Sequence, residues 1–87
     1  MRIVPLSVKE AEDFLKSHER HYTMPAEPIC AIGVAEEKLH GAAILGRKDG
    51  EGCLAHIYVD GAWQGYTLLY GACWRTLKAM GFDKAYL

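Results

Sequence analysis

The sequence predicts a small α/β domain of the α+β type, in which a mostly antiparallel sheet is covered by two helices. Short β-prone runs are separated by turn residues, and two longer stretches repeat apolar residues at helical spacing. The chain has 87 residues, of which 51% are hydrophobic. That length leaves room for one core, so residues 1–87 are expected to form a single domain.

A short apolar run and a capping signal predict the first two elements. Residues 2–6 are β-prone, and Ser7 and Glu10 follow with the S-x-x-E spacing of a capping box. A helix should therefore begin at Val8. Its expected apolar stripe consists of Val8, Ala11, Phe14, Leu15 and His18. Because charged residues occupy the opposite side, only one face of this helix should pack on the sheet.

Three strands are expected in the middle of the chain. Residues 19–28 predict a loop, because two prolines break the helical periodicity. Residues 29–35 and 39–46 then predict a hairpin closed by the charged turn 36–38. A further strand, over 53–59, follows an Asp-Gly turn in which glycine accepts a positive φ.

A second helix is predicted over residues 67–80, after Asp60-Gly61 ends the preceding strand and AWQGY forms a loop. Its apolar stripe should be Leu69, Cys73, Leu77 and Met80, widened by Tyr70 and Trp74, which we expect in the core. Gly81 stands where a C-terminal helix cap belongs, and residues 85–87 begin another strand.

Composition excludes several classes of protein. The net charge of −1 supplies no basic field for nucleic acid. No run approaches the roughly 20 apolar residues of a membrane span, and the N-terminal apolar stretch is too short for a signal peptide. We therefore expect a cytoplasmic protein with neither nucleic acid nor membrane as partner. Cys30, Cys53 and Cys73 lack metal or redox spacing and are expected to be buried, reduced thiols.

Residues 59–87 resemble the coenzyme A-binding core of the GNAT acyltransferases, in strand, loop, helix and following strand. A closer similarity, to an uncharacterised GNAT-like group of bacterial and phage proteins, lies in MRIVPLS, HERHY, AIGV, GAAILGR, YVDG and LYGACWRTLKAMGF. The resemblance implies the order β-α-β-β-β-α-β. It also implies an acetyl-CoA-dependent N-acetyltransferase, or its coenzyme-binding remnant, with a small-molecule or protein amine as acceptor.

In the GNAT fold the fourth strand splays from the fifth, and the loop and helix between them receive the pyrophosphate of the coenzyme. The residues that the resemblance assigns to coenzyme binding are Ile57, Tyr58, Val59, Gly61, Ala62, Trp63, Gln64, Gly65, Tyr66 and Thr67. In the family pattern Q/R-x-x-G-x-G/A, Gln64 and Tyr66 replace the glycines and Gly61 replaces the leading residue. Trp63 either stacks on the adenine of the coenzyme or fills the cleft.

His56 is the candidate catalytic base, because its imidazole titrates near neutral pH and its strand flanks the coenzyme in the family. The alternative is a histidine on the sheet face beside Tyr58. The related group carries an acidic residue and an arginine on this strand, where the present chain has Cys53 and His56. No metal is expected, since His18 and His21 lack a third ligand.

Two further expectations concern partners and completeness. His40 should be an exposed partner of Glu36 or Glu37. The chain stops after the fifth strand, where GNAT proteins continue, so it reads as a truncated domain, either naturally reduced or a fragment. The alternative to an enzyme is a non-catalytic protein-interaction module, possibly phage or mobile-element encoded, which forms a homodimer through an exposed sheet edge.

Overall fold

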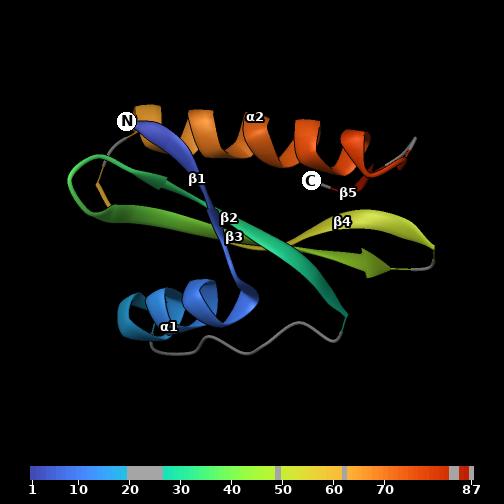
Figure 1. Ribbon diagram of the computed structural model, residues 1–87, viewed down its shortest axis with the longest axis horizontal. Helices are drawn as coiled ribbons and strands as arrows, with labels where there is room; N and C mark the ends of the chain where they lie inside the picture. Colours follow the sequence, from blue (N-terminus) through green and yellow to red (C-terminus); the bar gives the residue numbers. More distant parts are fainter. Residues whose placement is uncertain (20–26, 49, 62, 83–84, 87) are drawn as a thin grey trace.

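A sheet lies between two helices in the computed structural model of the chain, which describes residues 1–19, 27–48, 50–61, 63–82 and 85–86 (Figure 1). In chain order the elements are β1 (Arg2–Leu6), α1 (Val8–His18), β2 (Pro28–Ala35), β3 (Leu39–Lys48), β4 (Glu51–Val59), α2 (Trp63–Ala79) and β5 (Ala85–Tyr86). The predicted α+β class, with a mostly antiparallel sheet covered by two helices, is confirmed.

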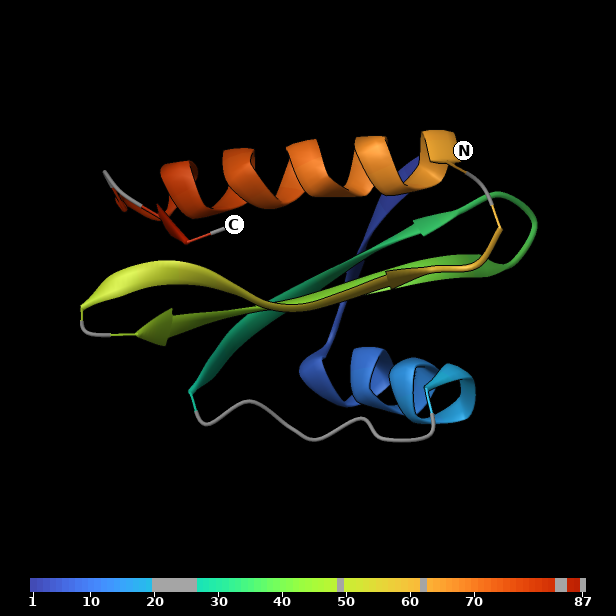
Figure 2. The same cartoon turned by 180° about the vertical axis from the view of Figure 1, so that it is seen from behind.

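The strands lie in the order β1-β2-β3-β4-β5, so every strand pairs with its neighbour in sequence. The first four are antiparallel, whereas β5 runs parallel to β4 and meets it through Gly52–Ala85 and Cys53–Tyr86. Helix α1 covers one face of the sheet and α2 covers the other (Figures 1 and 2). In the described parts of the chain, neither helix is long and apolar enough to cross a bilayer.

The capping box at the start of α1 forms as predicted. The Glu10 N–H donates to Ser7 Oγ at 3.0 Å, and the Ser7 N–H donates to Glu10 Oε1 at 2.9 Å. This second bond stabilises the carboxylate and lowers the pKa of Glu10 from its ordinary value. The buried stripe of α1 is narrower than expected: Ala11 and Leu15 are fully buried, whereas His18 is exposed.

Helix α2 begins at Trp63, four residues before the predicted start at Thr67. Residues 63–66, which were expected to form a loop, are therefore helical, and Gly65 packs where α2 crosses the sheet. A Cβ at this position would lie 2.9 Å from Met1 Sδ and 3.2 Å from Val59 Cγ1. The absence of a side chain at Gly65 therefore lets α2 pack closely against Met1 and Val59, whereas the sequence predicts a loop at this glycine.

The end of α2 is the Schellman motif that Gly81 predicted. Gly81 has φ +95°, its N–H donates to Lys78 O at 3.0 Å, and the Phe82 N–H donates to Leu77 O at 3.2 Å. Met80 was expected to extend the apolar stripe of the helix. It is 40% exposed instead, because the helix ends at Ala79 and the chain turns away.

Alternate residues of β2 and β3 supply two separate cores. The core between the sheet and α2, called the core under α2, consists of Ile32, Val34, Ala43, Leu45, Leu69, Ala72, Cys73 and Leu77. The core between the sheet and α1, called the core under α1, consists of Ala11, Leu15, Ala31, Ala42 and Ile44. Both central strands are therefore buried on two faces, which explains their continuous apolar sequence. Tyr70 and Trp74, predicted to be core residues, are only partly buried because they flank the fully buried row of α2.

The three cysteines are free thiols, as predicted, but only one is fully buried. Cys73 lies in the core under α2, and burial raises the pKa of its thiol to about 12. Cys30 and Cys53 are half-buried, which corrects the expectation for both, and Cys30 packs at the edge of the core under α2.

Candidate functional site

A β-bulge in β4 decides which way His56 faces. Leu45 pairs with Leu54 and Ile44 pairs with His56, so Ala55 is an extra residue in β4. Side chains alternate along a strand, and one extra residue therefore reverses the alternation. Leu54 packs against the core under α2, whereas His56 lies opposite Ile44 of the core under α1. The bulge thus turns His56 towards α1.

A carboxylate meets His56 on that side. Glu19 Oε2 lies in hydrogen-bond contact with His56 Nε2, and the side chains are 26% and 28% exposed respectively. Glu19 is the C-cap of α1, and its N–H donates to Leu15 O at 2.7 Å. The carboxylate that contacts His56 is therefore supplied by a different element of the fold. The sequence offered no local signal for this pair, because 37 positions separate its members.

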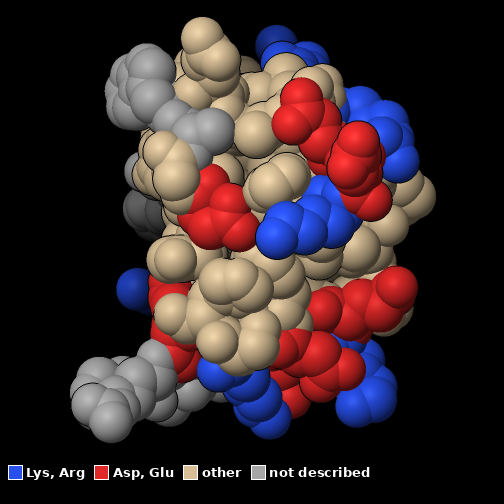
Figure 3. Space-filling view, turned by 90° about the vertical axis from the view of Figure 1, so that its left-hand side faces the viewer, with Lys and Arg blue, Asp and Glu red and all other residues tan. Residues whose placement is uncertain are grey.

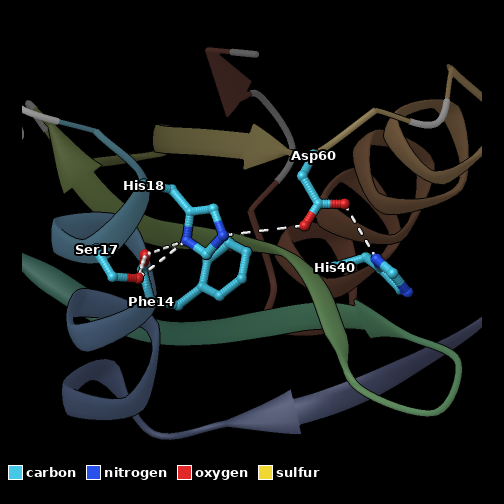
Figure 4. A network of polar contacts seen from close by, with 5 residues as sticks. All are labelled: Phe14, Ser17, His18, His40 and Asp60. Carbon is cyan, nitrogen blue, oxygen red and sulfur yellow. Dashed lines mark hydrogen bonds and ion pairs between the residues drawn. The ribbon is translucent and has the colours of Figure 1, made fainter.

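A second carboxylate bridges two further histidines beyond the end of β4 (Figure 4). Asp60 Oδ1 lies 3.0 Å from His40 Nδ1, and Asp60 Oδ2 lies 3.9 Å from His18 Nε2. His18 Nδ1 is 2.9 Å from Phe14 O, so the ring is also held by its own helix.

The partner of His40 is thus Asp60, and the predicted pairing with Glu36 or Glu37 is wrong. His40 is the extra residue of another bulge, because Val34 pairs with Gly41 and Ala35 pairs with Leu39. The bulge brings β3 against the end of β4, where the Asp60 N–H donates to His40 O at 2.8 Å. Glu36 contacts the N-terminus instead: its Oε1 lies 3.6 Å from the Met1 amino group.

Aromatic rings lie between the two carboxylate–imidazole pairs. The rings of Phe14 and His18 stack with centroids 4.1 Å apart, and the Tyr58 ring lies 5.6 Å from that of His18. The C-terminal end of α1 therefore contacts β4 through Glu19 and His56, and it contacts Asp60, just beyond β4, through His18. In the described ranges, no three His, Cys, Asp or Glu side chains are placed to hold a metal ion, and His21 lies outside those ranges.

The segment predicted to bind coenzyme runs along β4 into α2. Ile57 and Val59 pack towards the core under α2, and Tyr58 packs towards α1. Gly61 turns the chain with φ +66°. Gln64, Tyr66 and Thr67 are exposed on α2, and Gly65 is buried. Ala62 and the side chain of Trp63 lie outside the described residues, so neither role proposed for the Trp63 ring is tested.

The start of α2 carries no acidic side chain near its exposed backbone N–H groups within the first turn. No carboxylate in this turn therefore opposes the positive end of the helix dipole. Tyr66 stacks on Tyr70, one turn further along α2, with ring centroids 6.2 Å apart.

The surface around this end carries charges of both signs. Figure 3 shows lysine and arginine beside aspartate and glutamate, with neutral surface between them. A hollow of about 790 Å³ lies at the β2–β3 turn and is lined by Met1, Arg2, Ala35, Glu36, Glu37, Lys38 and His40. Among the described residues, its lining includes His40 but none of those predicted to bind coenzyme.

Comparison with protein-family models, with curated proteins and with solved structures found no match for this chain. Any statement about its function therefore depends on the site itself.

Proposed function

We propose that the chain is a GNAT-like domain that binds acetyl-CoA and transfers its acetyl group to an amine. The observation that carries the proposal is the geometry of β4. In the described part of the chain, β5 pairs with β4 only through Gly52 and Cys53. Residues 57–59 consequently have β3 on one side and no described strand on the other, directly before the start of α2.

Such an edge suits the pantetheine arm of the coenzyme. Alternate residues of an edge strand direct their backbone N–H and C=O groups outwards, where the amides of pantetheine can pair with them. The edge leads through Gly61 to the start of α2, whose unopposed N–H groups would face the pyrophosphate. Arm and pyrophosphate would thus be bound by consecutive parts of one segment.

His56 supplies the proton acceptor in this proposal. His56 directly precedes residues 57–59, the edge of β4 proposed to bind pantetheine. Its side chain lies on the α1 face of the sheet. A histidine in this place can take a proton from the acceptor amine, which must be neutral at nitrogen to attack a thioester. The acceptor would approach from the α1 side of β4.

Calorimetric titration with acetyl-CoA tests coenzyme binding. Gln64→Glu places a negative charge in the exposed first turn of α2, where it favours the helix but repels phosphate. We expect this variant to bind acetyl-CoA about tenfold more weakly, which corresponds to about 1.4 kcal/mol. Arg75→Gln is the matched control, because it changes the net charge equally on the same helix but three turns away. Absence of binding by folded wild type at high micromolar acetyl-CoA would remove the proposal.

A second candidate function, a protein-interaction module, is favoured by the contrast between the two sheet edges. Strand β1 carries Pro5, which hinders the addition of another strand. Residues 57–59 of β4 have no such protection. Sedimentation at several concentrations distinguishes the functions: dimerisation that acetyl-CoA leaves unchanged favours the module, and a monomer that binds acetyl-CoA favours the enzyme.

A further inference from the structure

We infer that Glu19, at the C-cap of α1, is a positioning residue for His56. The inference rests on the proposed function and deepens it, because it assigns the orientation of the base to a second residue. The direct contact between Glu19 Oε2 and His56 Nε2 is its foundation.

The contact determines the proton arrangement on the imidazole ring. An ionised carboxylate only accepts hydrogen bonds, so His56 Nε2 must carry the proton that is shared with Glu19. In the neutral ring the lone pair then resides on Nδ1, which becomes the proton-accepting atom. When His56 takes a proton, the adjacent negative charge of Glu19 stabilises the imidazolium.

Glu19 is well placed to impose this arrangement because its backbone is fixed. It caps α1 through the bond from its N–H to Leu15 O, and Leu15 itself is completely buried. The same end of α1 is attached to the sheet again by His18 and Asp60. A carboxylate on such a supported cap keeps its orientation without ordering a loop.

In the reaction, the acceptor ammonium first gives one proton to His56 Nδ1, which leaves a neutral amine. The amine lone pair forms the new C–N bond at the thioester carbonyl, and the C–S bond breaks with its electron pair leaving on sulfur. The remaining excess proton on nitrogen passes to the thiolate to give free coenzyme A. The imidazolium, stabilised by Glu19 in the interval, returns its proton to solvent.

The test compares Glu19→Gln with Glu12→Gln. The first replacement keeps an oxygen that can accept from His56 Nε2 and removes only the charge. The second makes the same change on the same helix, where Glu12 pairs with Lys16 at 2.8 Å rather than with a histidine. Acetyl transfer to a panel of primary amines is followed by chromatography of free coenzyme A, because the three free cysteines would react with thiol reagents.

We expect Glu19→Gln to lower kcat by about tenfold to a hundredfold and to shift the pH–rate profile, with KM for acetyl-CoA unchanged. Glu19→Asp should restore part of the loss, and Glu12→Gln should match wild type. A second readout, ¹⁵N NMR of the imidazoles, should show His56 with its proton on Nε2 in wild type and a mixed population in Glu19→Gln.

The outcomes separate this inference from the proposed function. If wild type binds and transfers acetyl groups but Glu19→Gln is as active as Glu12→Gln, the role of Glu19 is overturned and the proposed function stands. If wild type binds acetyl-CoA without transfer to any amine, both the catalytic half of the proposed function and the role of Glu19 fail. A His56 ring protonated on Nδ1 in wild type would refute the inference irrespective of activity.

Discussion

Gly41 of β3, which has no side chain, allows β3 and β4 to approach closely at the candidate site. A Cβ on Gly41 would lie 2.6 Å from Val59 Cγ2 and 2.9 Å from Tyr58 O. The second of these atoms belongs to the backbone of the strand that we propose to bind coenzyme, so it cannot move aside independently. Gly71, by contrast, lies on α2, where an added Cβ would meet only Arg75 Nη1, at 3.3 Å.

The two glycines predict opposite effects of the same substitution. Gly41→Ala should lower the free energy of unfolding by about 1–3 kcal/mol, because a methyl group must be forced into a filled space. Gly71→Ala should raise it by up to about 1 kcal/mol, because alanine favours the helix and the Arg75 side chain can shift. Urea denaturation measures both, and a destabilised Gly71→Ala protein would contradict the stated packing.

At the scale of elements, helix α1 carries the correctly predicted capping box at its N-terminal end and residues of the candidate site at its C-terminal end. Its capping box follows from Ser7 and Glu10 alone, because both hydrogen bonds lie within four residues. Its other end supplies Glu19 and His18, whose partners lie on β4 and just beyond it. Local sequence therefore predicted where the helix starts, but not what its end contacts.

The capping box predicts an acid-dependent part of stability. The pKa of Glu10 is lowered in the folded chain, mainly by the bond from the Ser7 N–H. A group of this kind stabilises the fold above its unfolded pKa, about 4.5, and the contribution disappears as the pH falls through the lower folded pKa. The stability of Glu10→Gln should accordingly fall less than that of wild type between pH 5 and pH 3.

Ser7→Ala completes a double-mutant cycle for the same element. Alone it should cost about 1 kcal/mol at pH 7, the usual value of an N-cap hydroxyl. Combined with Glu10→Gln it should cost less than the sum of the single changes, because the two residues share one set of bonds. Strict additivity in urea unfolding would show that the capping box contributes no coupled stability.

At the scale of the whole molecule, the two cores share a single sheet. Ile44 faces α1 while its neighbour Leu45 faces α2, so a defect under either helix acts on the same strand. In a domain of this size each core is small, and neither is expected to be stable alone.

The shared sheet predicts cooperative unfolding. Leu15→Ala under α1 and Leu69→Ala under α2 each remove a fully buried side chain and should each cost about 2–5 kcal/mol. Tryptophan fluorescence, which reports on α2 through Trp74, and far-UV circular dichroism should give coincident transitions in both variants. Loss of α1 in Leu15→Ala without any change in the fluorescence transition would show that the two layers unfold independently.

The sequence by itself determined the order of the elements, the capping box of α1 and the glycine that ends α2, because each depends on residues close together in the chain. Only the tertiary structure decided the candidate site. A single extra residue, Ala55, turns His56 to the α1 face, and the cap of α1 brings Glu19 to it. Alternation along a strand cannot reveal a bulge, and residues 37 positions apart leave no periodic signal, so this pair arises from strand register and helix packing alone.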